Sequence, residues 1–162
     1  MKPKFRAWSS KTAVLAEVIN IDFREKKLKV SHWEYGDSIY FPLGEVELMQ
    51  STGLKDKNGV EIFEGDIVRV FEYGIYGGTY NAPISWIKYE TEQEQWAFHG
   101  FTCVGVKEIE HHPEVESLFT RGFITRKFGS CVQLSELTKD SRNSIEVIGN
   151  IYEDKELLEV EG

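Results

Sequence analysis

The chain has 162 residues and a formal net charge of −8, from 19 Lys+Arg against 27 Asp+Glu. With 41% hydrophobic and 28% charged residues, the composition excludes a disordered chain and a membrane-spanning bundle, and the length favours one domain. The acidic balance argues against a duplex-DNA-binding protein that works by charge, because such proteins carry a basic face.

The N-terminal residues and the two cysteines bear on targeting and on the redox environment. Residues 1–5 are positively charged like the start of a secretion signal, but polar residues follow where an apolar core is required, so no signal peptide is expected. Cys103 and Cys131 have neither metal-ligand spacing nor the density of a disulfide framework. They predict buried thiols in a reducing cytoplasm.

The negative charge is concentrated in two segments. Residues 88–116 contain seven Glu against two Lys, and residues 153–162 contain five acids against one Lys. Their net charges of −5 and −4 leave the rest of the chain at +1. Such runs are ordinarily solvated surface, and the alternative is an acidic face that meets a basic partner.

Strand patterns dominate the first half of the chain. Residues 14–21 and 27–33 alternate apolar and polar side chains and are rich in β-branched residues, which predicts a hairpin with a turn at 22–26. Residues 56–59 end in Asn-Gly, the dipeptide that accepts positive φ at both central positions of a tight turn. Residues 66–73 predict a further strand.

The second half is less regular. Residues 73–83 concentrate glycines and tyrosines and predict a long, mobile loop. Residues 84–89 and 95–99 predict a hairpin around a Glu-rich turn at 90–94. The remaining expectations are a helical turn within 113–119, an ambiguous segment at 134–137, a strand at 144–152 and a short C-terminal helix at 153–159.

Many short strands joined by turns, with little helix, predict a mainly β fold (β-rich α+β), as a small barrel or a strongly bent sheet. The expected core comprises Ile62, Ile67, Val68, Val70, Trp86, Ile87, Val147, Ile148 and Ile151.

Catalytic and cofactor motifs are not found in the sequence. The glycines at 74–78 lack the Gly-Lys-Ser/Thr of a phosphate-binding loop, and no Gly-x-Ser-x-Gly elbow occurs. His111 and His112, set among glutamates, are weak candidates for a metal site, because neighbouring side chains diverge in regular structure. The sequence therefore predicts neither an enzyme nor a cofactor, and a metal-assisted enzyme around His111 and His112 is kept as a further alternative.

One basic and aromatic run lies at 121–128, where an ordinary amphipathic strand is the simpler interpretation. Such a strand could also bind single-stranded nucleic acid by stacking and phosphate neutralisation. The residues concerned are Arg121, Phe123, Arg126, Lys127 and Phe128.

Three segments together resemble the YopX family of small phage and prophage proteins: Lys4-Phe5-Arg6-Ala7-Trp8, residues 48–68 from Leu48-Met49-Gln50 to Asp66-Ile67-Val68, and Glu146-Val147-Ile148-Gly149-Asn150-Ile151-Tyr152-Glu153. The resemblance departs at Ser9-Ser10, and residues 74–130 match nothing recognisable. It implies an SH3-like barrel in cytoplasmic, phage-encoded proteins, and it brings no catalytic residues.

The prediction is thus a single YopX-like domain over residues 1–162, with the barrel built mostly from about 45–152 after an N-terminal β-hairpin segment at about 1–44. The predicted function is binding of a protein partner, with a second copy of the chain as one candidate, in the cytoplasm of a bacterial host. The tyrosines Tyr73, Tyr76 and Tyr80 are the candidate contact residues, because tyrosine is enriched at interfaces. The alternative is the nucleic-acid-binding strand at 121–128.

Overall fold

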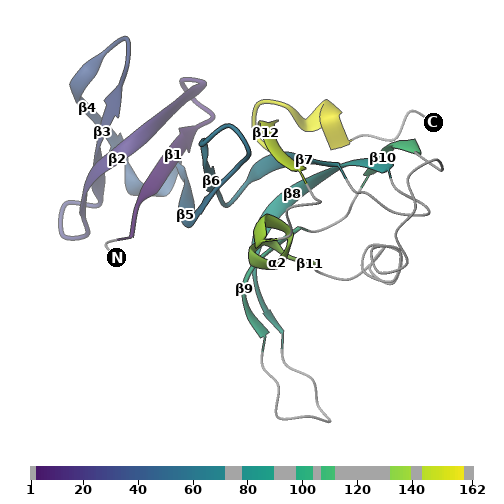
Figure 1. The fold of residues 1–162 in the computed structure, drawn as a ribbon. Helices are drawn as coiled ribbons and strands as arrows, with labels where there is room; N and C mark the ends of the chain where they lie inside the picture. The colour runs from purple at the N-terminus through teal and green to yellow at the C-terminus, as the bar shows by residue number, and fades with distance from the viewer. Residues whose placement is uncertain are drawn as a thin grey trace. The chain divides into compact units, whose positions relative to one another are not determined.

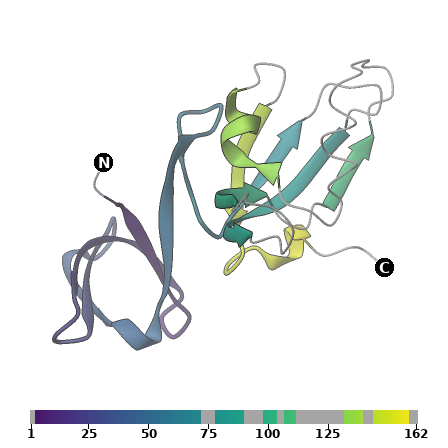
Figure 2. The ribbon, with the colours of Figure 1, turned by 90° about the horizontal axis from the view of Figure 1, so that it is seen from below.

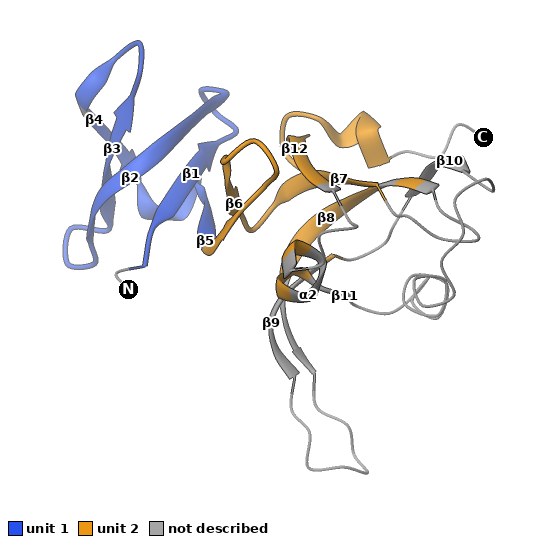
Figure 3. Cartoon of the chain, viewed as in Figure 1, with its two compact units in different colours: residues 1–51 blue, residues 52–162 orange. Residues whose placement is uncertain are grey.

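The computed structural model describes residues 3–71, 78–89, 98–103, 107–111, 132–139 and 144–158. Strands predominate among them, which confirms the mainly β class. The chain divides into two compact units, unit 1 at residues 1–51 and unit 2 at residues 52–162 (Figure 3). Within the described ranges, no helix has the length and apolar character needed to cross a membrane.

Unit 1 is built on one antiparallel sheet with the strand order β4-β3-β2-β1-β5-β6, whose last strand, β6 (Glu61–Phe63), belongs to unit 2 (Figure 1). Its elements are β1 (Phe5–Ser9), β2 (Val14–Asp22), β3 (Lys27–His32), β4 (Gly36–Pro42), the 3-10 helix η1 (Leu43–Glu45) and β5 (Glu47–Lys55), whose last residues belong to unit 2. The predicted hairpin at 14–33 is confirmed, although its second strand ends one residue early, at His32. Seen from below, the strands curve around the centre of the unit (Figure 2).

Alternation along β3 and β4 decides which side chains of unit 1 are buried. Leu28 and Val30 are fully buried, and Leu28 lies opposite the buried Phe41 in the register of the two strands. Successive side chains of a strand point to opposite faces, so Lys29 and its partner Tyr40 lie on the outer face. The sheet therefore presents an outer face whose side chains are not part of the core.

Unit 2 contains an antiparallel sheet with the order β11-β9-β8-β7-β12, and β10 also pairs with β8 (Figure 1). Its elements are β6 (Glu61–Phe63), β7 (Asp66–Phe71), β8 (Gly78–Tyr89), β9 (Phe98–Cys103), β10 (Lys107–His111), β11 (Val132–Gln133), α2 (Leu134–Lys139), β12 (Ser144–Asn150) and the 3-10 helix η3 (Lys155–Leu158).

The prediction of a loop at 73–83 is wrong for residues 78–83, which form the first half of β8. They pair with β7 from Phe71↔Thr79 to Ile67↔Pro83, so the glycine, asparagine and proline of this stretch are held by hydrogen bonding to a neighbouring strand. Local turn propensity is overridden because the buried strand β7 needs a partner for its backbone groups. Residues 73–77 lie outside the described ranges.

Other element predictions have mixed outcomes. The predicted hairpin after residue 84 is confirmed by the pairing of β8 with β9, from Tyr89↔Phe98 onward, while residues 90–97 lie outside the described ranges. The strand at 144–152 is confirmed as β12, but its last two residues are in a turn. The C-terminal helix is present as η3, and the ambiguous segment is the helix α2. The helical turn within 113–119 falls outside the described residues.

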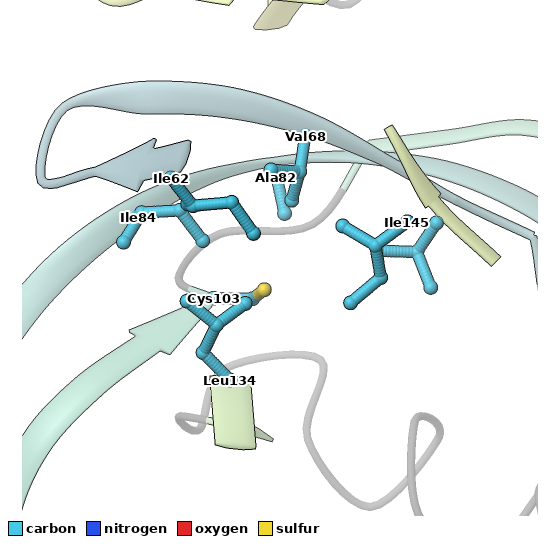
Figure 4. Packing of buried hydrophobic residues seen from close by; sticks show 8 residues of the cluster. Ile62, Val68, Ala82, Ile84, Cys103, Leu134 and Ile145 are labelled. Carbon is cyan, nitrogen blue, oxygen red and sulfur yellow. The ribbon is translucent and has the colours of Figure 1, made fainter. Parts of the chain in front are cut away.

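The core of unit 2 confirms four predicted residues, Ile62, Ile67, Val68 and Val70, which are all buried. Val147 and Ile148 are only partly buried, because β12 is the end strand of its sheet, and Ile151 is partly buried in the turn after it. The core cluster in Figure 4 also includes Cys103, expected to be a buried thiol, and four buried residues that were not predicted, namely Ala82, Ile84, Leu134 and Ile145. The side chains of Trp86 and Ile87 lie outside the described part of the structure.

Barrel closure is not among the described strand pairings, since β4 and β6 are the ends of one sheet order and β11 and β12 are the ends of the other. The SH3-like barrel at about 45–152 and the single-domain organisation therefore stay predictions.

Candidate binding surface

Most of the side chains proposed as a site from the sequence lie outside the described part of the chain. These are Tyr73, Tyr76, Arg121, Phe123, Arg126, Lys127, Phe128 and His112. Tyr80 lies in β8, where it is opposite Val70 of β7 and Glu108 of β10, so its backbone belongs to a sheet and not to a loop. His111 is the last residue of β10. The described residues contain no group of three His, Cys, Asp or Glu side chains placed to hold a metal ion.

Exposed aromatic side chains gather instead in unit 1. The described chain has six large hydrophobic residues that are exposed, and five of them lie between residues 19 and 40: Ile19, Phe23, Trp33, Tyr35 and Tyr40. Trp33 is 89% exposed and Phe23 75% exposed. Single exposed apolar residues are common, but a concentration of aromatics on one hairpin needs an explanation.

Two of these rings, Trp33 and Tyr35 in the turn between β3 and β4, lie against the ring of His32 at the end of β3. The His32 ring stacks on Tyr35, with centroids 4.9 Å apart and an interplanar angle of 23°, and lies 5.6 Å from the Trp33 ring. The backbone N–H of Glu34 donates to His32 Nδ1 at 3.2 Å, so the neutral imidazole carries its proton on Nε2. Aromatic contacts and one hydrogen bond therefore orient the turn.

The outer face of the same hairpin adds two lysines. Lys27 Nζ lies 5.4 Å from the centroid of the Tyr40 ring, a cation–π distance, and Lys29 is the cross-strand partner of Tyr40. We define the β3–β4 surface as Lys27, Lys29, His32, Trp33, Tyr35 and Tyr40. It combines planar apolar groups with cations on one β-hairpin.

A second group of polar residues lies in the segments that carried the sequence resemblance, and these residues are buried. Asp56, 8% exposed, accepts three backbone hydrogen bonds: from Asn58 and Val60 to Oδ1 at 2.8 and 2.9 Å, and from Val147 of β12 to Oδ2 at 3.0 Å. The predicted turn at 56–59 is confirmed, but only Gly59 has positive φ, at 79°. The glycine is the last residue of this turn, so the Asn-Gly pair does not occupy its two central positions.

The next turn repeats this use of a carboxylate. Asp66, 1% exposed, accepts the backbone N–H of Phe63 at 2.8 Å. Gly65, at φ 85°, donates its N–H to the carbonyl of Ile84 and accepts from the N–H of Ile151. One glycine thus connects the β6–β7 turn to β8 and to the residue after β12.

In the third resemblance segment, hydrogen bonds to Asn150 hold the turn that follows β12. Asn150 Oδ1 accepts the backbone N–H groups of Tyr152 and Glu153, and its own N–H donates to Asp154 Oδ2, all at 3.0 Å. A Cβ placed on Gly149 would lie 2.7 Å from Asp154 Cγ and nearer still to Oδ2. Glycine is required here because the Asp154 carboxylate occupies the position of a side chain.

A family model described as "YopX protein" matches residues 4–159. The chain belongs to the YopX family. It is also similar to the protein EF1440 from Enterococcus faecalis, known from a crystal structure, with 23% identity over 98% of this chain and 99% of that one and a TM-score of 0.45. A search of curated proteins finds no match.

In this YopX-family chain the parts of the resemblance segments that lie in unit 2 therefore have a structural role there. Their carboxylates and glycines form hydrogen bonds with backbone groups at two turns and directly after β12. Buried backbone groups without such partners would lower the stability of the fold. The β3–β4 surface was missed because residues 27–33 were assigned to a strand. A Trp-Glu-Tyr-Gly sequence at a hairpin end was the available signal, since turn positions are ordinarily polar.

The predicted burial is confirmed for Cys103, a free cysteine whose sulfur lies among the core side chains in Figure 4. Burial raises the pKa of the Cys103 thiol from 9.0 to about 12. Because the raised pKa disfavours the thiolate in the folded state, stability from this group is complete below pH 9 and is lost as the pH rises toward 12.

We expect native protein with Cys131→Ser to show no thiol reaction with Ellman's reagent at pH 8, and to release one equivalent after unfolding in guanidinium. The thiolate is the reacting form, and at pH 8 burial suppresses it. Absorbance at the product wavelength checks this. Reaction of the folded variant at the rate of free cysteine would contradict the burial of Cys103.

Proposed function

We propose that this YopX-family chain is a phage- or prophage-encoded, non-catalytic binding protein that recognises a protein partner through the β3–β4 surface in the cytoplasm of a bacterial host. The observation that carries the proposal is the exposure of Trp33, Tyr35 and Tyr40 on one hairpin. Rigid aromatic rings supply contact area with little loss of side-chain entropy, and they are enriched at protein interfaces.

The partner is recognised by side chains and not by strand addition. β4 is an end strand, but Asp37 and Ser38 together lie opposite the single residue Ser31, which forms a bulge, and the strand ends in Pro42. Bulges and prolines are devices that protect sheet edges from pairing with another chain. The aromatic side chains of the β3–β4 turn and the outer face of the hairpin are therefore the surfaces that a partner can contact.

The charge pattern favours a protein over a nucleic acid at this surface. Residues 19–42 carry four Lys and Arg and four Asp and Glu, so a phosphate backbone would gain little net attraction. Aromatic residues within a rim of mixed charge are typical of protein interfaces.

A second candidate function is binding of single-stranded nucleic acid by the run Arg121, Phe123, Arg126, Lys127 and Phe128. The observation that favours it is the alternation of cations and aromatic residues in this one stretch of sequence. The tyrosines Tyr73, Tyr76 and Tyr80 stay proposed as additional protein contacts.

We expect the double variant Trp33→Ala, Tyr35→Ala to lose the protein partner that the wild-type chain retains from phage-infected or prophage-induced cells. Truncating central aromatic anchors typically costs about 2 kcal/mol or more each in binding. The measurement is affinity capture with tagged full-length protein, in nuclease-treated and untreated halves, followed by mass spectrometry and nucleic-acid analysis.

The matched control is Val60→Ala, which removes an exposed apolar side chain from unit 2. It should retain the partner, and all variants should unfold at the same urea concentration. Partner retention by the double variant would contradict the proposal. Retention that disappears with nuclease, and with Arg126→Ala, Lys127→Ala, would favour the nucleic-acid function.

A further inference from the structure

The charges on the hairpin that carries the β3–β4 surface are balanced in number but separated along its length. Residues 22–29, from the end of β2 into the first half of β3, carry four Lys and Arg against two Asp and Glu, net +2. Residues 30–42 carry Glu34 and Asp37 and no Lys or Arg, net −2. Glu34 lies in the β3–β4 turn and Asp37 at the start of β4. We call residues 22–29 the basic end, and Glu34 with Asp37 the acidic end.

Distance keeps the two ends electrostatically distinct. β3 has six residues, so at about 3.3 Å per residue its ends lie roughly 17 Å apart. The Debye length at physiological salt is about 8 Å, so the charge at one end does not cancel the charge at the other. A uniformly negative partner is attracted to the basic end and repelled by the acidic end, whereas a partner with the reversed polarity is attracted at both ends.

Lysines of the basic end and a carboxylate of the acidic end share the outer face of the hairpin. Lys27, Lys29 and Ser31 alternate along β3, so their side chains lie on the same face. The Ser31 hydroxyl donates to Asp37 Oδ1 at 2.5 Å, which places this carboxylate on that face as well. Glu34 and Asp37 are exposed, and no charged side chain of either end forms an ion pair with a described residue. Both ends are therefore open to the charges of a partner.

Exposed apolar side chains lie beside these charges. Tyr40 is 55% exposed and is the cross-strand partner of Lys29 in β4. Ile19 is 49% exposed and directly precedes Asn20, the partner of Lys29 in β2. Together with the rings of the β3–β4 turn, these side chains offer apolar contact area along the hairpin.

We propose that the partner of the β3–β4 surface is the same surface of a second copy of this chain, turned end for end about a two-fold axis. This inference rests on the proposed function. The rotation places the basic end of each copy opposite the acidic end of the other, so the charge contact forms twice. The exposed aromatic rings then supply apolar contact between the two outer faces.

This contact is isologous, because both copies use the same surface. It is complete when two copies have met, so the assembly is a closed dimer and does not grow further. Salt weakens it because the attraction acts between exposed charges, and at about 1 M salt the Debye length falls to about 3 Å.

The test measures the mass of the full-length protein by light scattering over a range of concentrations at low salt. We expect the mass to rise with concentration and to level off at twice the 18.7 kDa of one chain. Association should weaken by roughly tenfold or more in about 1 M salt and in two charge-reversal variants. Lys27→Glu, Lys29→Glu makes both ends acidic, and Glu34→Lys, Asp37→Lys makes both ends basic.

Combining the reversals separates charge pairing from damage to the fold. A chain with all four reversals has inverted polarity and should dimerise again. An equimolar mixture of the two double variants should form a mixed dimer, because an acidic surface then meets a basic one. The control Lys55→Glu, Lys155→Glu makes the same charge change at exposed residues of unit 2 and should still dimerise.

A wild-type protein that stays monomeric at high concentration and low salt would overturn this inference. Dimers that none of the charge reversals weakens, or growth beyond two copies, would overturn it as well. If a monomeric protein nevertheless retains a different protein in affinity capture, and Trp33→Ala, Tyr35→Ala releases it, the proposed function stands and only the identity of the partner is wrong. If monomers also retain no partner, both proposals fail.

Discussion

Replacing Asp56 with alanine is expected to lower the free energy of unfolding by about 3–4 kcal/mol, a large effect for one side chain. The substitution removes the acceptor of three backbone N–H groups, those of Asn58, Val60 and Val147. Two of these bonds hold the turn after β5, and the third joins that turn to β12, 91 residues away. The carboxylate is nearly buried, so water cannot fully replace the lost bonds. Urea denaturation of the full chain measures the change.

Two variants separate this role from a general effect of mutating the turn. Asn58→Ala removes an exposed side chain whose one hydrogen bond, to Glu146, is 3.4 Å long, so it should cost about 0.5 kcal/mol or less. Asp56→Asn keeps one side-chain oxygen as an acceptor, so its loss of stability should lie between those of Asp56→Ala and Asn58→Ala. Equal stability of the Asp56→Ala and wild-type proteins would show that these bonds do not support the fold.

Gly149→Ala is the second substitution with a large expected effect, about 1–3 kcal/mol of stability lost. Its new Cβ would lie 2.9 Å from Asp154 Cβ and closer to the carboxylate, so Asp154 must move. That movement breaks the hydrogen bond from the Asn150 N–H to Asp154 Oδ2. The same denaturation experiment measures the loss.

The control for Gly149 is Gly44→Ala, because a Cβ at Gly44 meets no atom within 4 Å. Reducing the freedom of the unfolded chain should make that change neutral or slightly stabilising. A double-mutant cycle with Asp154→Ala provides the decisive comparison: if the clash is the cause, Gly149→Ala should cost less once Asp154 is truncated. Equal costs in both backgrounds would exclude the clash as the cause.

The binding proposals and these stability predictions concern different units. Asp56 and Gly149 lie in unit 2, in segments that the family resemblance identified, and their neighbours are backbone groups of the chain. Trp33 and Lys27 lie in unit 1, outside those segments, and they face solvent. Stability variants should therefore leave the β3–β4 surface chemically unchanged, and binding variants should leave stability unchanged.

Features that depend on neighbouring residues were predictable from the sequence. The hairpin at 14–33, the turn at 56–59 and the strand β7 follow from apolar alternation and from turn residues, which act over a few positions. The burial of Ile62, Val68 and Cys103 follows from their apolar character, and the YopX resemblance followed from three segments in the right order.

Features that depend on pairing across the chain were decided by the tertiary structure. Residues 78–83 have the composition of a loop, yet they form a strand because β7 lies beside them. The carboxylate of Asp56 looks like an ordinary turn residue, and its bond to Val147 exists only once β12 is in place. The exposure of Trp33 and Tyr35 likewise depends on where β3 ends and on which face of the hairpin covers the core. Local sequence thus determined most strands and turns and the burial of strongly apolar residues. The pairing of strands, the burial of polar groups such as Asp56 and the position of the exposed aromatic surface were decided by contacts between residues far apart, whose pairing no local pattern encodes.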